Sequence, residues 1–356
     1  TIIAPSSRDN GASAAAGLML NIFSEIDLIS VDMPLTKWKL SNWDKALKKW
    51  EEFFSNDGFI FNKQIYSSYG TKIYCDKNSS NKLEKQSFLK LAETAEIYKT
   101  IKETKKKDEI FLPYEHSVDA RFVLRLLDDF VKKNAVVIDD YVEQIKLNQN
   151  NVDILIKSEK KSLRYDKVIL AAGSISSKIL EKSCLNNSNI PRCLNGVGSA
   201  IEIFSEIDYI EQLKTNHILR SPNRGGTCGI HMVQRSNSIY VGASSVVTDK
   251  NLKFPRLGSI ETLINGAKKE LNLGNIVRQS LNILTGYRPI SQDAVPIFGE
   301  LYENLFLCYG HKRDGFTWAP FLSEIIDNWI NKVSFNSEFS RYLDICNPHR
   351  SKFALL

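Results

Sequence analysis

The sequence has no long hydrophobic segment. Its longest apolar runs, such as 168–172 and 305–309, have the length of buried strands, whereas a helix that crosses a bilayer needs about 20 apolar residues. We therefore expect no membrane span. No secretory leader is visible and the first residue is Thr1, so we expect the natural N-terminus, with any targeting signal, to lie upstream.

Cysteine and histidine are scarce and scattered. The six cysteines form no C-x-x-C pair, and they are not spaced from the five histidines like the ligands of a metal. We therefore expect no metal site. The absence of paired cysteines indicates a reduced compartment, and we predict a cytoplasmic protein.

Several catalytic motifs are also missing. The chain has no P-loop, no G-x-S-x-G elbow and no Ser-His-Asp order, which argues against hydrolysis, phosphoryl transfer and metal catalysis. Neither an internal repeat nor a low-complexity segment occurs.

Neither sign of charge dominates. The 47 basic residues exceed the 41 acidic ones by a net charge of +6, and the one lysine run covers 105–107. We interpret this run as solvated surface and expect no nucleic-acid partner. With 43% hydrophobic and 25% charged residues over 356 positions, the composition predicts a globular protein of roughly two domains.

Apolar periodicity predicts helices and strands in both halves of the chain. The expected helices cover 41–55, 83–105, 119–133, 174–180, 259–271 and 320–333. The expected strands cover 1–4, a hairpin over 59–74, and 135–138, 142–147, 152–156, 168–172, 201–204, 218–219, 229–233, 239–243 and 305–309. This order predicts a mixed α/β protein, in which a nucleotide-binding domain built from separated segments is interleaved with an antiparallel substrate domain.

One candidate cofactor contact follows the apolar run V-I-L-A-A-G-S at 168–174. Ligands bind beyond the carboxyl ends of strands in open α/β sheets, which makes Ala172 and Gly173 candidates. Packing at an ordinary strand-to-helix turn explains the pattern equally well. The small residues of 10–17 likewise suit either a close approach of the backbone to a ligand or a tightly packed helix start.

A second candidate site combines T-G-Y-R-P-I-S-Q-D at 285–293 with G-H-K-R-D-G at 310–315, which we interpret as glycine-bounded turns. The guanidinium of Arg288 could bind a carboxylate through both of its amino groups. Alternatively, Arg288 pairs with Asp293 and holds a turn together, an interpretation that spacing alone slightly favours. His231 lies in the apolar run I-H-M-V, where a structural role is the more usual one.

These segments, in this order, resemble the FAD-dependent D-amino-acid oxidase family, and glycine oxidases and sarcosine oxidases most of all. The similarity rests on G-Y-R-P-I-S-Q-D-A-V-P-I-F-G at 286–299 and G-H-K-R-D-G-F-T-W-A-P at 310–320. The family patterns are G-x-R-P-x-x-x-D-x-x-P-x-x-G and G-H-x-R-x-G-x-x-x-A-P. The resemblance extends over nearly the whole chain and is weakest between 57 and 107.

The resemblance implies a fold, a cofactor and a site. It implies an FAD-binding domain of the glutathione-reductase type over 1–40, 108–200 and 280–335, and a substrate domain over 41–107 and 201–279. The cofactor would contact Ala12, Ser13, Ala16, Gly17, Ala172, Gly173, Gly310, His311 and Gly315. Arg288 would bind the substrate carboxylate, with His231 and Arg313 as further polar groups of the catalytic site.

The sequence departs from the family pattern at several places. The G-x-G-x-x-G turn that seats a pyrophosphate does not occur, and Ala4 stands where an acidic residue for the ribose is expected. His231 takes the place of a tyrosine of the glycine oxidases. No cysteine lies between Leu281 and Leu307, so non-covalent FAD is expected.

The sequence-based prediction is an enzyme that oxidises the C–N bond of a small amino acid or secondary amine by hydride transfer to FAD, after which the imine hydrolyses. The alternative is a non-catalytic or truncated flavoprotein-like subunit that cannot hold FAD alone. A third hypothesis, supported by the basic charge, is an oxidoreductase that acts on a nucleoside or a protein-bound amine. Assembly into a homo-oligomer stays open.

Overall fold

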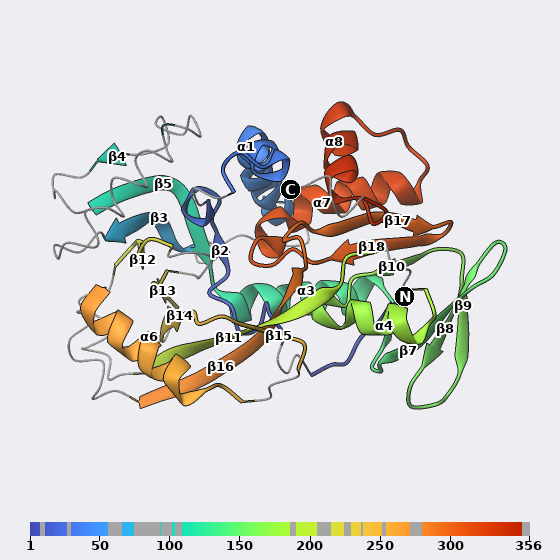
Figure 1. The fold of residues 1–356 in the computed structure, drawn as a ribbon, viewed down its shortest axis with the longest axis horizontal. Coiled ribbons are helices and arrows are strands. Elements are labelled where there is room, and N and C mark those ends of the chain that lie inside the picture. The colour runs from blue at the N-terminus through green and yellow to red at the C-terminus, as the bar shows by residue number, and fades with distance from the viewer. Residues whose placement is uncertain are drawn as a thin grey trace.

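The computed structural model describes the whole chain except residues 8–10, 27–29, 56–65, 75–92, 94–101, 104–108, 186–189, 205–214, 224–228, 236–237, 251–253, 271–279 and 351–356. Helices and strands are mixed along the chain, as Figure 1 shows. The expected mixed α/β class is confirmed.

A ten-stranded sheet is the largest element of the molecule. Its main path runs β15-β11-β14-β13-β12-β3-β5-β2, with β16 paired to β11 and β4 paired to β5. Every neighbouring pair is antiparallel except β12 and β3. The strands are β2 (Met19–Leu20), β3 (Tyr66–Tyr74), β4 (Lys102–Glu103), β5 (Glu109–Val118), β11 (Cys193–Phe204), β12 (Ile218–Arg220), β13 (His231–Gln234), β14 (Ile239–Gly242), β15 (Val246–Thr248) and β16 (Ser280–Ser291). Helix α6 (Leu257–Glu270) covers one face, where Leu263 packs with Ile201 and Ile203 of β11.

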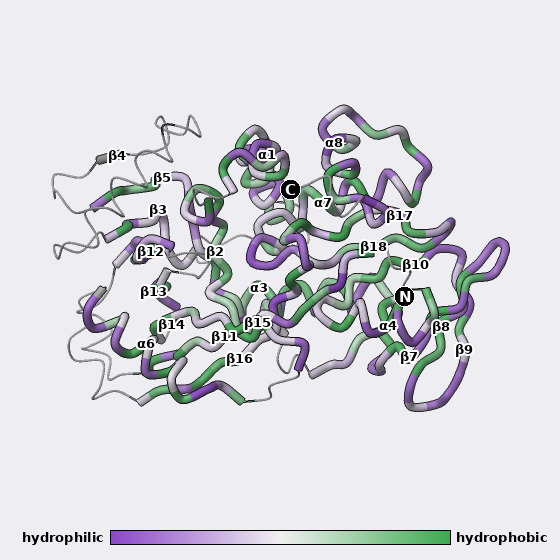
Figure 2. Tube along the Cα trace, in the orientation of Figure 1, coloured by the Kyte–Doolittle hydropathy of each residue, from purple (hydrophilic) through white to green (hydrophobic). Residues whose placement is uncertain are grey.

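Two further parallel pairs lie outside the large sheet. β1 (Ile2–Ile3) pairs with β6 (Val137–Ile138), and β10 (Val168–Leu170) pairs with β18 (Leu305–Tyr309). β17 (Ile297–Tyr302) extends the second pair in the antiparallel direction. β18 is apolar and buried on both faces, as parallel strands covered on both sides usually are, whereas Ile169 of β10 is exposed; Figure 2 shows this hydrophobic region.

A further sheet consists of β7 (Val142–Leu147), β8 (Val152–Ile156) and β9 (Ser162–Tyr165), which are joined as antiparallel hairpins. Residues Gly173–Ile175 form a 3-10 turn, η3, after β10 and lead into α4 (Ser176–Lys182), which packs on the same apolar cluster as this sheet. Helix α3 (Ala120–Asn134) precedes β6, and its first turn is capped by the Asp119 carboxylate.

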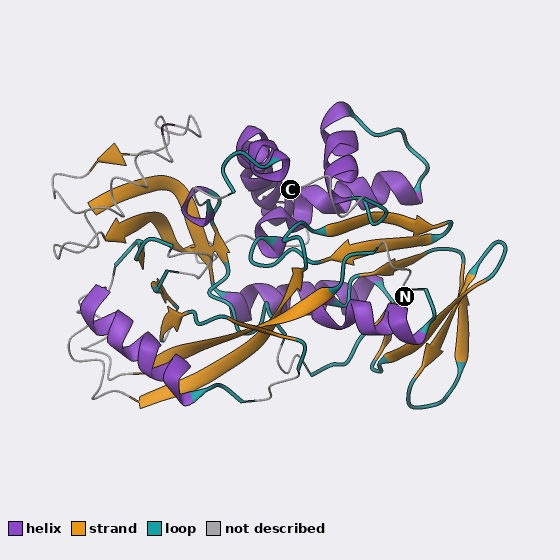
Figure 3. Cartoon of the chain, in the orientation of Figure 1, coloured by secondary structure: helices purple, strands orange, loops and turns teal. Residues whose placement is uncertain are grey.

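Three helices lie across β17 and β18 from α4 (Figure 3). They are α1 (Pro34–Ser55), α7 (Gly315–Ile330) and α8 (Ser337–Cys346). Trp38 of α1 lies 4.9 Å from Trp318 of α7 and 4.5 Å from Tyr342 of α8, measured between ring centroids. This aromatic cluster connects the start of the chain with its end.

Several predicted elements need correction. The expected helix over 83–105 lies mostly outside the described residues, and Lys102–Glu103 form a strand. The expected turn at 285–293 is mainly strand β16, because a twelve-residue register with β11 supplies its hydrogen bonds. β9 and α8 were not predicted. Helix α7 begins at Gly315, five residues before Pro320. Pro320 has no N–H to donate to the Phe316 carbonyl, and this carbonyl accepts instead from Trp50 Nε1 at 3.2 Å.

The expected domain boundaries stay a prediction. β5, β11 and β16 fall wholly or partly within the segments expected for the cofactor domain, and all three are strands of the large sheet. Helix α1 falls mostly within the segment expected for the substrate domain and packs against α7 and α8.

Candidate active site

Arg288 lies on β16 beside two glycines of β11, Gly196 and Gly198. The register places Arg288 opposite Gly196, and Gly198 opposite Gly286. A Cβ atom at Gly198 would collide with the guanidinium of Arg288, so the side chain extends over the surface that this glycine leaves free. Arg288 Nη1 donates to the backbone oxygen of Ser244 at 3.0 Å.

Arg288 has no acidic partner within the described part of the chain. The predicted alternative, an Arg288–Asp293 pair, is wrong. Asp293 instead binds Arg350, whose Nε and Nη2 donate to the two carboxylate oxygens at 2.8 and 3.0 Å. Arg288 thus remains a half-buried cation whose charge is not neutralised by an ion pair among these residues.

His231, on β13, is 5% exposed and lies close enough to Arg220 and Arg288 to sense their charges. Burial, followed by the positive charge of Arg220, lowers the pKa of His231 to about 3, and the charge of Arg288 acts in the same direction. The ring stacks on Tyr240 at 5.7 Å, and its Nδ1 lies 3.2 Å from the oxygen of Gly229. His231 is therefore a neutral polar group at physiological pH.

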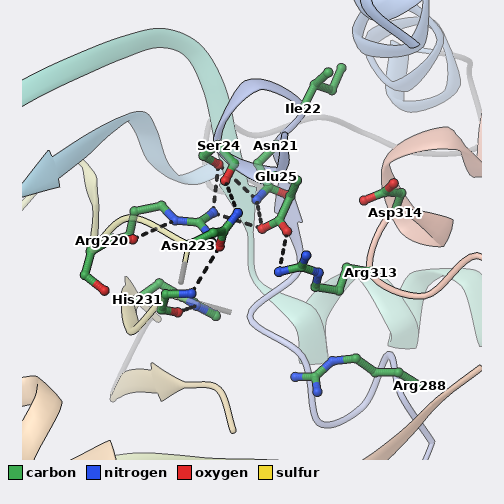
Figure 4. Close-up of polar contacts among 12 residues, drawn as sticks. Asn21, Ile22, Ser24, Glu25, Arg220, Asn223, His231, Arg288, Arg313 and Asp314 are labelled. Carbon is green, nitrogen blue, oxygen red and sulfur yellow. Dashed lines mark hydrogen bonds and ion pairs between the residues drawn. The ribbon is translucent and has the colours of Figure 1, made fainter. Parts of the chain in front are cut away.

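Arg313 joins the site from the loop before α7. Its Nη1 lies 2.7 Å from Oε2 of Glu25, which belongs to the 3-10 turn η1 (Phe23–Glu25). The other oxygen, Oε1, accepts from Arg220 Nη1 at 2.9 Å and from Asn21 Nδ2 at 2.9 Å. Figure 4 shows Glu25 between the two guanidinium groups, with Arg288 and His231 nearby.

The Glu25 carboxylate is ionised although it is buried. Burial alone would raise its pKa, but the charges of Arg313 and Arg220 and the Arg220 hydrogen bond outweigh burial and lower the pKa to about 2. Arg220 is 1% exposed and also donates to Ser24 Oγ and Asn223 Oδ1, each at 2.8 Å. This network holds η1, the large sheet and the loop before α7 in one arrangement.

A cavity lies between residues of the 21–39 segment and the 311–314 loop, and Glu25 and Arg313 are among its walls. Its charged and polar walls are Asn21, Glu25, Ser30, Thr36, Lys39, His311, Lys312, Arg313 and Asp314, and Ile22 and Trp318 are among its apolar walls. Lys39 and Asp314 form an ion pair across it.

The predicted cofactor segment 12–17 packs against β16 and β14. Gly286 allows this approach, because a Cβ atom there would lie 2.8 Å from Cβ of Ala15 and 3.3 Å from Cα of Ala12. The backbone oxygen of Ala16 accepts from Arg235 Nη2 at 2.8 Å, and Gly17 is buried against Tyr240. Ser13 is exposed.

The 310–315 loop combines a left-handed glycine, a buried histidine nitrogen and a helix start. Gly310 adopts a φ of +83°, in the left-handed region that favours glycine. The buried Nε2 of His311 has no partner among the described residues, and burial, followed by the charge of Lys39, lowers the His311 pKa to about 4. Helix α7 starts at Gly315, and the side chain of its N-cap residue, Asp314, does not accept from its first amides; the N-terminal amides of a helix can donate to a ligand acceptor.

The predicted contacts Ala172 and Gly173 lie at the carboxyl end of β10. Gly173 has a φ of +61°, and a Cβ atom there would meet nothing within 4 Å. The strand end is therefore open to a ligand.

Glu25, Arg220 and Lys39 were not predicted from the sequence. Glu25 and Arg220 each lie between a serine and an apolar residue, and they meet only because η1 packs against β12 across 195 positions of sequence. No local pattern could have joined them. No group of three or more His, Cys, Asp or Glu side chains suited to a metal occurs in the described ranges, and none of the described helices could span a membrane.

Comparison with known proteins matches a family and a fold. The family model described as FAD dependent oxidoreductase matches residues 12–329. A solved iminodiacetate oxidase from a Chelativorans species superposes with a TM-score of 0.74 at 16% identity, covering 96% of this chain and 91% of that one. Glycine oxidase from Geobacillus kaustophilus gives a TM-score of 0.74 at 16% identity, with 94% and 88% covered.

An L-α-glycerophosphate oxidase from Mycoplasma pneumoniae, solved with FAD bound, gives a TM-score of 0.73 at 14% identity, with 93% and 88% covered. At these identities the neighbours establish the fold. A search of curated proteins found no match.

Proposed function

The chain belongs to the family of FAD dependent oxidoreductases, and we propose that it oxidises the carbon–nitrogen bond of a small amino acid or secondary amine that carries a carboxylate. FAD is the cofactor of the family, and when bound it supplies a two-electron acceptor for hydride. Iminodiacetate and glycine are substrates named for two of the structural neighbours, and both carry an amine next to a carboxylate.

The observation that carries this proposal is the Arg288 guanidinium. Arg313 and Arg220 share Glu25, and Arg350 binds Asp293, whereas Arg288 donates to a single backbone oxygen among the described residues. A planar guanidinium with free donors binds a carboxylate in two parallel hydrogen bonds. Arg288 would therefore fix the substrate by its carboxylate and orient the adjacent amine carbon.

The side chains of His231 and Tyr240 would shape the region where the substrate binds beside Arg288 and would exclude water from it. His231 is neutral, so it contributes a hydrogen bond without a second positive charge. Tyr240 backs the His231 ring, and its hydroxyl donates to the Ala15 oxygen at 3.2 Å. No side chain is needed as a general base if the amine binds unprotonated, because orientation and exclusion of water then supply the catalysis.

The proposed cofactor contacts are the backbone around Ala12–Gly17, the strand end at Ala172–Gly173, and the loop with Gly310, His311 and Gly315. His311 Nε2 has no partner among the described residues, and the Asp314 side chain does not cap the first amides of α7; both observations support a contact of this loop with hydrogen-bonding atoms of the cofactor. Non-covalent attachment stays a prediction. The alternative, a subunit that does not bind FAD, predicts that the purified chain lacks flavin absorbance after incubation with FAD.

A matched substrate pair tests the proposed function. N-methylglycine and dimethylamine are secondary amines that differ by one carboxylate. We expect kcat/KM of the FAD-loaded protein to be at least about 100-fold higher for N-methylglycine, because dimethylamine leaves Arg288 without an anion. Equal rates for the two amines would contradict the role of Arg288, and no oxidation of either would contradict the function itself.

A further inference from the structure

We propose that Glu25 determines substrate specificity in this site: its carboxylate occupies Arg313 and repels a second substrate carboxylate, so that the site selects amines with a single carboxylate. This inference rests on the proposed function and names its substrate class.

The geometry gives Arg313 an internal anion. Arg313 Nη1 and Glu25 Oε2 are 2.7 Å apart, and the two side chains are 13% and 10% exposed. The charge of Arg313 is thus directed at Glu25 before any substrate enters. Of the two arginines predicted for the site, only Arg288 keeps a charge without an acidic partner among the described residues.

The position of Glu25 is fixed from the other side. Arg220 Nη1 and Asn21 Nδ2 both donate to Oε1 at 2.9 Å, and Arg220 is itself held by Ser24 and Asn223. The carboxylate therefore cannot rotate away from Arg313 without breaking hydrogen bonds that are buried in the protein.

The other charges near Glu25 are largely balanced locally. Lys39 pairs with Asp314, and Glu115 accepts from the backbone N–H groups of Ile22 and Ser24 at 3.2 and 2.8 Å. Lys312 is a further cation at the cavity wall. Glu25 is an anion in direct contact with Arg313.

A fixed anion beside a guanidinium acts against a second carboxylate in two ways. The incoming group would have to displace Glu25 from a buried ion pair, and it would meet a like charge at short range in a site of low dielectric. Specificity that depends on a built-in repulsive group is a general device of binding sites.

The test compares N-methylglycine with iminodiacetate, which has the same secondary amine and one extra carboxylate. In the FAD-loaded protein we expect kcat/KM to favour N-methylglycine by at least about tenfold. In Glu25→Gln, which keeps the shape and removes the charge, the iminodiacetate to N-methylglycine ratio should rise by about tenfold or more.

Two variants serve as controls. Asn21→Ala removes a hydrogen bond from the same Glu25 oxygen without changing the charge, so the ratio should stay within about twofold of the parent. Glu25→Asp keeps the negative charge, and it should keep the preference for a single carboxylate. A merely structural role of Glu25 would instead lower both rates in proportion and leave the ratio unchanged.

Binding measurements on the unaltered chain keep the proposal testable if Glu25→Gln does not fold. Isothermal titration with acetate and malonate should show weaker binding of malonate. A parent protein that prefers iminodiacetate or malonate, or a folded Glu25→Gln with an unchanged ratio, would overturn the proposal. If neither amine is oxidised, the proposed function fails, while the acetate and malonate affinities still decide the role of Glu25.

Discussion

At the scale of single residues, Arg288 is the side chain on which the proposed chemistry depends. We expect Arg288→Ala to lower kcat/KM for N-methylglycine by roughly 30- to 5,000-fold, which corresponds to about 2–5 kcal/mol of lost binding to a buried charged partner. Arg288→Lys should recover only part of this loss, because an ammonium cannot form two parallel hydrogen bonds with a carboxylate. Steady-state kinetics measures both effects.

The melting temperature of the Arg288 variants supplies the control. Arg288 donates to a single backbone oxygen and has no ion pair in the described part of the chain, so removal should change the melting temperature little. An early-melting Arg288→Ala protein that loses activity on all amines alike would contradict a binding role.

His231 gives a prediction about pH. Its folded pKa of about 3 lies below the ordinary value of 6.5, so between these values the unfolded chain binds a proton that the folded chain does not. Stability should therefore fall as pH drops from about 6.5 towards 3, with a slope of up to about 1.4 kcal/mol per pH unit from this group. Urea unfolding at several pH values should show a shallower slope in His231→Gln. An identical slope would place the titration elsewhere, for example at His311.

The residues of the site differ in how far the sequence could predict them. Arg288, Arg313 and His231 come together in Figure 4, and their roles stay predictions. The alternative pair of Arg288 with Asp293 was wrong because Asp293 meets Arg350, 57 positions later. Partners so distant in sequence leave no periodic signal, and Glu25 and Arg220 were missed for the same reason.

At the scale of elements, the paired strands β11 and β16 set the position of Arg288. A methyl group at Gly198 would occupy the place of the guanidinium, which lies at the end of a flexible side chain and can move away. We therefore expect Gly198→Ala to fold, and to lower kcat/KM towards the value of Arg288→Ala.

Gly196→Ala is the matched control in the same strand. A Cβ atom there would collide with the Ile290 side chain and would come within 3.3 Å of Cβ of Arg288, but it would not reach the guanidinium. It should affect stability more than substrate binding. Full activity in Gly198→Ala would show that the substrate does not need Arg288 in its present position.

The elements with strong local signals were predicted well. β7, β8 and β18 have the predicted bounds, and α3 covers Ala120–Asn134, one residue later than the predicted 119–133. β16 was missed because Gly286, Pro289 and the polar residues around them suggest a turn, while the strand depends on its long pairing with β11. Helix α8 was missed because its stability comes from packing of Phe339 and Tyr342 on α1 and β17.

At the scale of the whole molecule, Arg350 ties the end of the chain to the segment between β16 and β17. It donates to both oxygens of Asp293, to Val295 O and to Pro296 O. We expect Asp293→Asn to destabilise the protein by about 3 kcal/mol, because it leaves a buried cation without an anion. Chemical denaturation measures the effect.

The exposed pair of Lys160 and Glu143 provides the comparison. Its side chains are 65% and 30% exposed, so Glu143→Gln should change stability far less than Asp293→Asn does. Similar losses in the two variants would show that the Asp293–Arg350 pair is not a main connection of the fold.

The proposed function requires that this FAD dependent oxidoreductase removes hydride from a carbon that carries both an amine and a carboxylate. The most direct measurement is an anaerobic titration of the FAD-loaded protein with N-methylglycine, followed by flavin absorbance. We expect the oxidised flavin band to disappear with about one equivalent of amine oxidised per flavin, and to persist in Arg288→Ala at the same concentration. A flavin that stays oxidised with every amino acid and secondary amine tested, or that is reduced by glycerol 3-phosphate alone, would contradict the account.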